Sequence, residues 1–243
     1  MSDRKVFSMI FDTHAHYDDK KFDADRKEVL SAMPASGVSL ILDPGCDGGS
    51  SRAACALAKE FPFVYAAVGW HPEEWQSWNG ESMALLRSLC AQPKVVAIGE
   101  IGLDYYWKEN PPRDFQQQVF HKQLDLAQEL GLPVIVHDRE AHGDSLEIVK
   151  EFPGVRGVFH CYSGSAEDAK TLVKLGWHLS FTGTITFKNA RKAPEVIAAV
   201  PLERIMVETD SPYLTPEPFR GKRNDSGKVH LVAEKIAQVK GLD

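Results

Sequence analysis

The chain has 243 residues, of which 43% are hydrophobic and 26% charged, and this size and balance fit one globular domain, residues 1–243, with a large core. No stretch approaches the roughly 18 uninterrupted apolar residues of a membrane span, no secretory signal is present, and the four cysteines lack Cys-x-x-Cys spacing, so we expect a cytoplasmic protein with reduced thiols and no membrane partner. The net charge of −6 argues against tight, charge-driven coating of nucleic acid, which needs a broad basic surface.

Short apolar runs alternate with helical segments along the whole chain. Strands are expected at 6–10, 38–42, 63–68, 95–100, 133–137, 157–160, 179–183 and 205–210. Helices are expected at 23–35, 50–61, 81–91, 112–131, 145–152, 166–176, 194–200 and 229–239. Eight such units with short connections predict an α/β fold with a parallel sheet, and they favour a closed, TIM-type (β/α)8 barrel over an open doubly wound sheet.

Ligand-type side chains stand where these strands end. His14 and His16 follow the first strand and, two residues apart in extended backbone, point the same way. Later strands end on Glu100, His137, His160 and Asp210. Taken singly, His137 could be a capping histidine and Asp210 a helix N-cap. Because the carboxyl ends of barrel strands meet at one mouth, we instead expect all six side chains in one site.

Four imidazoles and two carboxylates suit two divalent ions such as Zn²⁺ or Mn²⁺, with Mg²⁺ also possible. Two ions about 3.5–4 Å apart could clamp a phosphate ester and lower the pKa of a bound water to about 7. Asp210 is the candidate that orients this water and takes its proton, and Glu100 is the candidate that bridges the ions. No Ser or Cys has a His–Asp partner at a recognisable spacing, so covalent catalysis is disfavoured.

Six blocks of the sequence resemble those of TatD-family metal-dependent DNases, in the family's order and over almost the whole chain. They are Phe11–His16, Gly69–Pro72, Ile98–Tyr106, Val136–Arg139, Phe159–Gly164 and Val207–Tyr213. The resemblance implies metal ligands at the same six residues that strand counting selects. It also implies divalent-metal-dependent hydrolysis of DNA phosphodiesters, as a 3′-5′ exonuclease. Asp225-Ser226 departs from the family pattern, where Glu-Pro is common, and the chain ends without the final helical segment usual in the family.

Contacts to substrate are expected from loops around the same mouth. His71 is a candidate phosphate donor, although it could equally pack beside Pro72. Positive charge at the mouth would come from Arg139, Arg220, Lys222 and Arg223, unless these are ordinary solvated charges. Tyr105, with Tyr106 and Trp107, either stacks on unpaired bases or packs against neighbouring loops. Glu208, two residues before Asp210, faces the same way and is a candidate partner for a ligand histidine.

Three functions therefore compete. The leading hypothesis is a monomeric metal-dependent phosphodiesterase that acts on DNA or another phosphodiester. The alternative is an amidohydrolase-type metalloenzyme that cleaves a small amide or ester, since a similar barrel supports both chemistries. A lysine carbamate bridging the ions would favour the alternative, but Glu100 occupies that position. The third is a non-catalytic metal-binding scaffold, which the presence of Asp210 disfavours.

Overall fold

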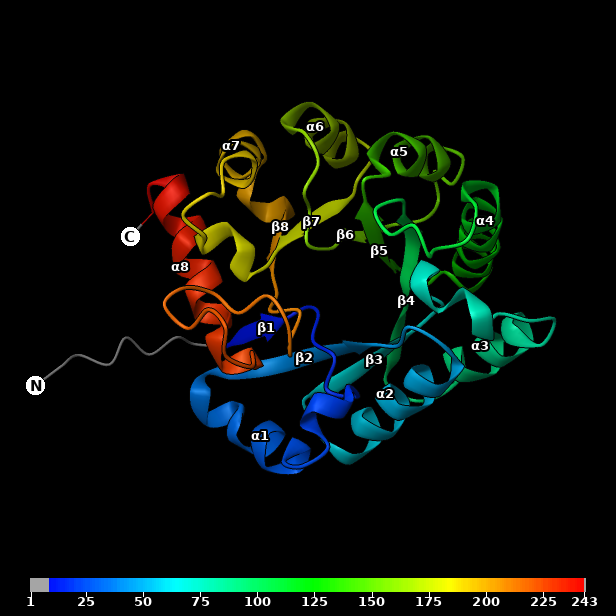
Figure 1. Cartoon of the computed structure of the whole chain (residues 1–243), viewed down its shortest axis with the longest axis horizontal. Coiled ribbons are helices and arrows are strands. Elements are labelled where there is room, and N and C mark those ends of the chain that lie inside the picture. The colour runs from blue at the N-terminus through cyan, green and yellow to red at the C-terminus, as the bar shows by residue number, and fades with distance from the viewer. Residues whose placement is uncertain (1–8, 243) are drawn as a thin grey trace, which may run out of the picture.

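The computed structural model describes residues 9–242 and shows the eight-stranded parallel barrel that the sequence predicts (Figure 1). The strands follow chain order around the barrel: β1 (Ile10–Asp12), β2 (Val38–Pro44), β3 (Val64–Val68), β4 (Val95–Asp104), β5 (Val134–Arg139), β6 (Gly157–Phe159), β7 (His178–Phe181) and β8 (Ile205–Val207). The backbone beyond β8 closes the ring against the residues after β1, because Asp210 N donates to His14 O and His16 N donates to Ser211 O.

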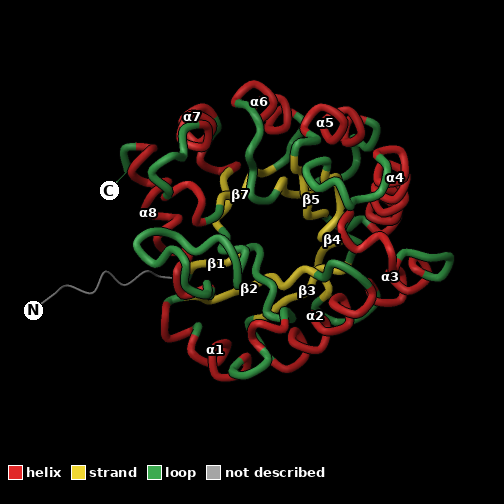
Figure 2. Tube along the Cα trace, in the orientation of Figure 1, coloured by secondary structure: helices red, strands yellow, loops and turns green. Residues whose placement is uncertain are grey.

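Helices form an outer ring around the strands (Figure 2). They are α1 (Arg26–Ala32), α2 (Gly48–Glu60), α3 (Ser82–Cys90), α4 (Arg113–Leu130), α5 (His142–Lys150), α6 (Ala166–Lys174), α7 (Lys192–Ala199) and α8 (Val229–Lys240). Helix α2 begins with a capping box between Asp47 and Ser50, and α4 ends at Gly131, which adopts the left-handed conformation that glycine allows. Among the described residues, no helix is long and apolar enough to cross a membrane.

Most expected bounds differ from the observed ones by a few residues, and three differences are larger or bear on the site. The predicted helix over 23–35 is wrong in length: α1 covers seven residues, and a separate 3-10 turn begins at Pro34, whose ring removes the N–H that a continuing helix needs. Strand β4 does not end on Glu100 but continues to Asp104, with a register shift between Ile98 and Ile101. Strand β8 has three residues and stops before Asp210. Most of the first predicted strand, residues 6–8, lies outside the described residues.

Two apolar layers support the barrel. The larger layer lies between strands and helices and contains fully buried aromatic side chains such as Phe22, Phe120 and Trp177. A smaller cluster takes one residue from each of five consecutive strands: Leu42, Ala67, Ala97, Ile135 and Val158. Because these alternate along their strands with residues of the outer layer, they fill the barrel interior.

Candidate metal centre

The six candidate ligands lie together, and Glu100 is at their centre. Its Oε2 is 3.2 Å from His14 Nε2 and 3.5 Å from His16 Nε2. Its Oε1 is 2.8 Å from both His137 Nδ1 and His160 Nε2. The carboxylate thus has one oxygen toward the histidines that follow β1 and the other toward His137 in β5 and His160 after β6. Glu100 could therefore contribute one oxygen to metal binding on either side.

Asp210 lies beside the first-strand histidines. Its Oδ1 is 3.8 Å from His14 Nε2 and 3.6 Å from His16 Nε2. Its backbone has φ of 54°, a left-handed conformation that Asp adopts more readily than most residues. The hydrogen bond from Asp210 N to His14 O holds this turn against the first strand, so the carboxylate is aimed by barrel closure.

Acceptors behind the histidines fix which ring nitrogen faces the centre. His137 Nε2 is 3.1 Å from Asp104 Oδ2, and His16 Nδ1 is 3.1 Å from Pro44 O. Glu208, the expected partner of a ligand histidine, has its Oε1 3.5 Å from His160 Nδ1, but His160 Nδ1 forms no hydrogen bond. Asp104 and Pro44 O each favour a proton on the outer nitrogen of their histidine and leave the lone pair of the inner nitrogen free for an ion.

Asp104 was not identified from the sequence. The signal was available, because Asp104 follows Glu100 by four residues and an even spacing on a strand places two side chains on one face. The predicted strand 95–100 ends at Glu100, and this prediction leaves Asp104 out of the site. Fully buried Asp104 also accepts hydrogen bonds from the backbone N–H groups of Tyr106 and Trp107.

The site is electrostatically crowded. Burial opposes ionisation of Glu100, yet the surrounding histidines, with His160 first, hold the pKa of Glu100 well below its usual value. Burial and the neighbouring His137 lower the pKa of His71 to about 4, so His71 is neutral at physiological pH. Burial raises the pKa of Asp210, despite the opposing effect of His14 and His16. Imidazole and carboxylate donors converging within a buried space fit the donor preferences of Zn²⁺ and Mn²⁺.

His71 belongs to this cluster rather than to the outer loop. Its Nε2 is 3.5 Å from Glu100 Oε1, and its ring lies 4.3 Å from that of His137. Its Nδ1 accepts a hydrogen bond from Glu73 N, so the proton of the neutral ring is on Nε2. His71 therefore presents an N–H donor at the centre.

The other candidate substrate contacts lie in two regions, one around the ends of β4 and β5 and the other on the loop before α8. Arg139 stacks 3.9 Å from the ring centroid of Tyr106 and 5.2 Å from that of Trp107, just beyond β4 and β5. Tyr105 instead packs inward, where its hydroxyl donates to Asp144 and its ring lies under Arg113.

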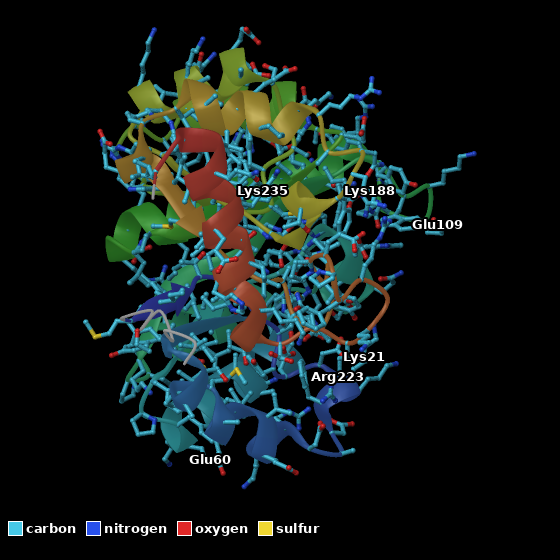
Figure 3. All side chains as sticks on the ribbon, turned by 90° about the vertical axis from the view of Figure 1, so that its left-hand side faces the viewer. Lys21, Glu60, Glu109, Lys188, Arg223 and Lys235 are labelled. Atoms are coloured by element: carbon cyan, nitrogen blue, oxygen red, sulfur yellow. The ribbon has the colours of Figure 1, made fainter. Side chains whose placement is uncertain are left out.

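The basic residues after β8 lie on the loop that precedes α8. Arg223 forms a bidentate pair with Asp25 and donates to Lys21 O, and Figure 3 shows Arg223 and Lys21 close together on one side of the barrel. Arg220 stacks on Phe187, and Lys222 is exposed. In the same loop Asp225 caps the turn Ser226–Lys228, so the departure from Glu-Pro is accommodated by a local hydrogen bond.

The chain is similar to several known proteins over nearly its whole length. The family model described as TatD related DNase matches residues 11–243. The uncharacterized metal-dependent hydrolase YabD of Bacillus subtilis is 45% identical over 236 residues, covering 96% of this chain and 92% of that protein. The 3'-5' ssDNA/RNA exonuclease TatD of Cronobacter sakazakii is 34% identical over 96% of this chain and 91% of its own length. The crystal structure of the TatD homologue YJJV from Escherichia coli superposes with a TM-score of 0.89 at 33% identity, covering 95% of this chain and 90% of that one.

Proposed function

The chain belongs to the TatD-related DNase family of metal-dependent hydrolases, and from that premise we propose that it removes nucleotides from the 3′ end of single-stranded DNA. The observation that carries the proposal is the position of Glu100, whose Oε2 faces His14 and His16 while its Oε1 faces His137 and His160. A phosphodiesterase that stabilises both the attacking and the leaving oxygen needs such a divided site.

The protein side chains have separate roles in this proposal. His14, His16 and Asp210 would hold one divalent ion of the Zn²⁺, Mn²⁺ or Mg²⁺ type and His137 with His160 the other, with Glu100 contributing to both. When bound, the ions supply Lewis-acid stabilisation of the phosphate and make a water nucleophilic at neutral pH.

Asp210 takes the proton of the attacking water. Burial raises its pKa, which makes this carboxylate a better proton acceptor than an exposed aspartate. His71, neutral and with its proton on Nε2, donates to a non-bridging phosphate oxygen.

Arg139, Tyr106 and Trp107 form a platform for the unpaired base next to the cleaved bond. Tyr106 is 51% and Trp107 46% exposed, and Arg139 covers part of both rings. The backbone of both aromatic residues is tied to Asp104, the partner of His137, so the platform has a fixed position relative to the metal centre. A stacking surface accepts any base, as a non-specific exonuclease requires.

The proposal is tested with 5′-labelled single-stranded DNA and metal-stripped protein, to which Mg²⁺, Mn²⁺ or Zn²⁺ is returned. We expect a ladder of products shortened from the 3′ end, blocked by phosphorothioate linkages at that end and absent with Asp210→Asn. If protein that binds metal leaves the DNA intact with every ion and instead cleaves small amides or esters, the amidohydrolase alternative is correct.

The platform has its own test. Replacing Tyr106 and Trp107 together by alanine should raise KM for single-stranded DNA about tenfold or more while kcat changes little, because stacking is worth about 1–3 kcal/mol per base. Leu202→Ala is a matched control, since Leu202 is 48% exposed and precedes β8 at the opposite end of the barrel. Equal KM values for the double variant and the control would contradict this role.

A further inference from the structure

Behind His16, on the side away from Glu100, lies a pair of carboxylates that the catalytic proposal does not use. Asp43 is near the end of β2, and Asp18 lies in the turn after the first-strand histidines. One ligand atom from each of His16, Asp18 and Asp43 lies within 4.8 Å of the others. His16 Nδ1 is 3.9 Å from Asp18 Oδ1, whereas His16 Nε2 faces Glu100.

Three of the four oxygens of this carboxylate pair have no hydrogen-bond partner. Asp43 has no exposed surface, and neither of its oxygens has a hydrogen-bond partner; Asp18 Oδ1 is buried and also without one. Within residues 9–242 no lysine or arginine forms a salt bridge with either carboxylate, and the sole ion-pair neighbour is His16 at 3.9 Å. Two buried carboxylates facing each other without compensation cost several kcal/mol, so a proton or a cation must offset their charge.

The space next to Asp18 is open to solvent and acidic, whereas Asp43 is not among its lining residues. A cavity of about 300 Å³ is lined by His16 and Asp18 and by three further carboxylates, those of Asp19, Asp47 and Glu74. Its remaining lining residues are Cys46, Ser50 and Tyr213, and the positive charge of Lys21, which lies over the Tyr213 ring, acts on Asp19. Burial and the charge of Asp47 raise the pKa of Glu74, as expected where negative charges crowd together.

We propose that Asp18 and Asp43 bind a hard divalent cation of the Mg²⁺ and Ca²⁺ class, separate from the ions of the Glu100 cluster and reached through this cavity. The donors are oxygens, because His16 Nδ1 is already used in its hydrogen bond to Pro44 O. Oxygen donors favour Mg²⁺ and Ca²⁺ over Zn²⁺, and the cavity leaves room for the waters that complete their coordination. The cation neutralises the buried pair.

The test measures binding in the absence of DNA, so its outcome is independent of the exonuclease proposal. Protein loaded with Zn²⁺, which prefers the imidazole-rich cluster, is dialysed to equilibrium against radioactive Ca²⁺. We expect one bound Ca²⁺ per chain, displaced by excess Mg²⁺. Asp43→Asn keeps the shape of the side chain and removes its charge, and we expect at least tenfold weaker Ca²⁺ binding with an unchanged Zn²⁺ content.

Asp19→Asn is the matched control, because Asp19 lines the same cavity but already accepts hydrogen bonds from Lys21 N and Tyr213. It should retain Ca²⁺ binding. Asp18→Asn provides a second loss-of-binding variant if Asp43→Asn does not fold. A wild-type protein that binds no Ca²⁺ would show that the pair shares a proton instead, and Asp43→Asn and Asp18→Asn variants that bind as tightly as wild type would also overturn the proposal.

Discussion

Asp104→Asn tests how the metal centre is held without altering any candidate ligand. In the wild type, Asp104 Oδ2 accepts the proton of His137 Nε2, which leaves His137 Nδ1, 2.8 Å from Glu100 Oε1, free to face an ion. Burial opposes ionisation of Asp104, but the hydrogen bond from His137 and those from the Tyr106 and Trp107 backbone hold its pKa below the usual value. Asp104 is therefore an anion that stabilises this tautomer.

Asparagine at position 104 keeps the shape of the side chain and one oxygen for the Tyr106 and Trp107 N–H groups. Its amide group then faces His137 Nε2 as a donor, so His137 is driven to the tautomer with its proton on Nδ1. Loss of such an outer carboxylate typically costs 10–100-fold in metal affinity, or about 1.4–2.7 kcal/mol. We expect this loss for one of two ions, the one proposed to lie between Glu100, His137 and His160.

The assay is a competitive titration of Zn²⁺ or Mn²⁺ against a chelator, with both stoichiometric steps resolved. The metal affinity of one step should fall 10–100-fold, and that of the other should stay within about twofold of the wild-type value. The rate of DNA cleavage should fall in parallel. Asp144→Asn is the control, because Asp144 accepts hydrogen bonds from Tyr105 and Gln117 outside the centre. Unchanged affinity in Asp104→Asn, or equal weakening of both steps, would refute the tautomer argument.

Three further predictions concern the same end of the barrel. Asp210→Asn should lower kcat about 10²–10⁴-fold with an unchanged circular dichroism spectrum, since it removes a proton acceptor, and retained turnover would exclude this role. The double variant His14→Ala, His16→Ala should lose about one metal per chain by elemental analysis; unchanged metal content would show that the first-strand assignment is wrong. Burial raises the pKa of Asp12 from 3.8 to about 7, so the Asp12 carboxyl binds its proton more tightly in the folded state than in the unfolded state. The free energy of unfolding should therefore fall as the pH rises from about 4 to 7, by up to roughly 4 kcal/mol. In metal-free protein, the free energy of unfolding of Asp12→Asn minus that of the wild type should therefore increase across this pH range. If this difference does not change with pH, the raised pKa of Asp12 is wrong.

The sequence by itself determined the barrel and the composition of its mouth. Strand and helix periodicities are local properties, set by which side chains must be buried on one face, and they can be read over a window of a few residues. Once eight units alternate, the rule that parallel strand ends share one rim brings His14, Glu100, His160 and Asp210 to the same place. The six blocks shared with the TatD family pointed to the same residues.

The tertiary structure decided how those residues face one another. That Glu100 divides its oxygens between two groups of histidines depends on the bulge in β4, which the apolar run at 95–98 does not reveal. The partnership of Asp104 with His137 joins side chains from neighbouring strands, and the pairing of Arg223 with Asp25 joins residues 198 positions apart.

The pairing of Asp18 with Asp43 likewise depends on the full fold. In the sequence, each is an ordinary aspartate next to a turn, and neither spacing nor periodicity indicates that two carboxylates will be buried face to face. The distance between them is fixed only when β1 and β2 pair and the backbone after β8 closes against the first-strand histidines. Local patterns specify which surfaces are buried, whereas contacts between polar groups of distant segments depend on the register of strand pairing and the closure of the barrel.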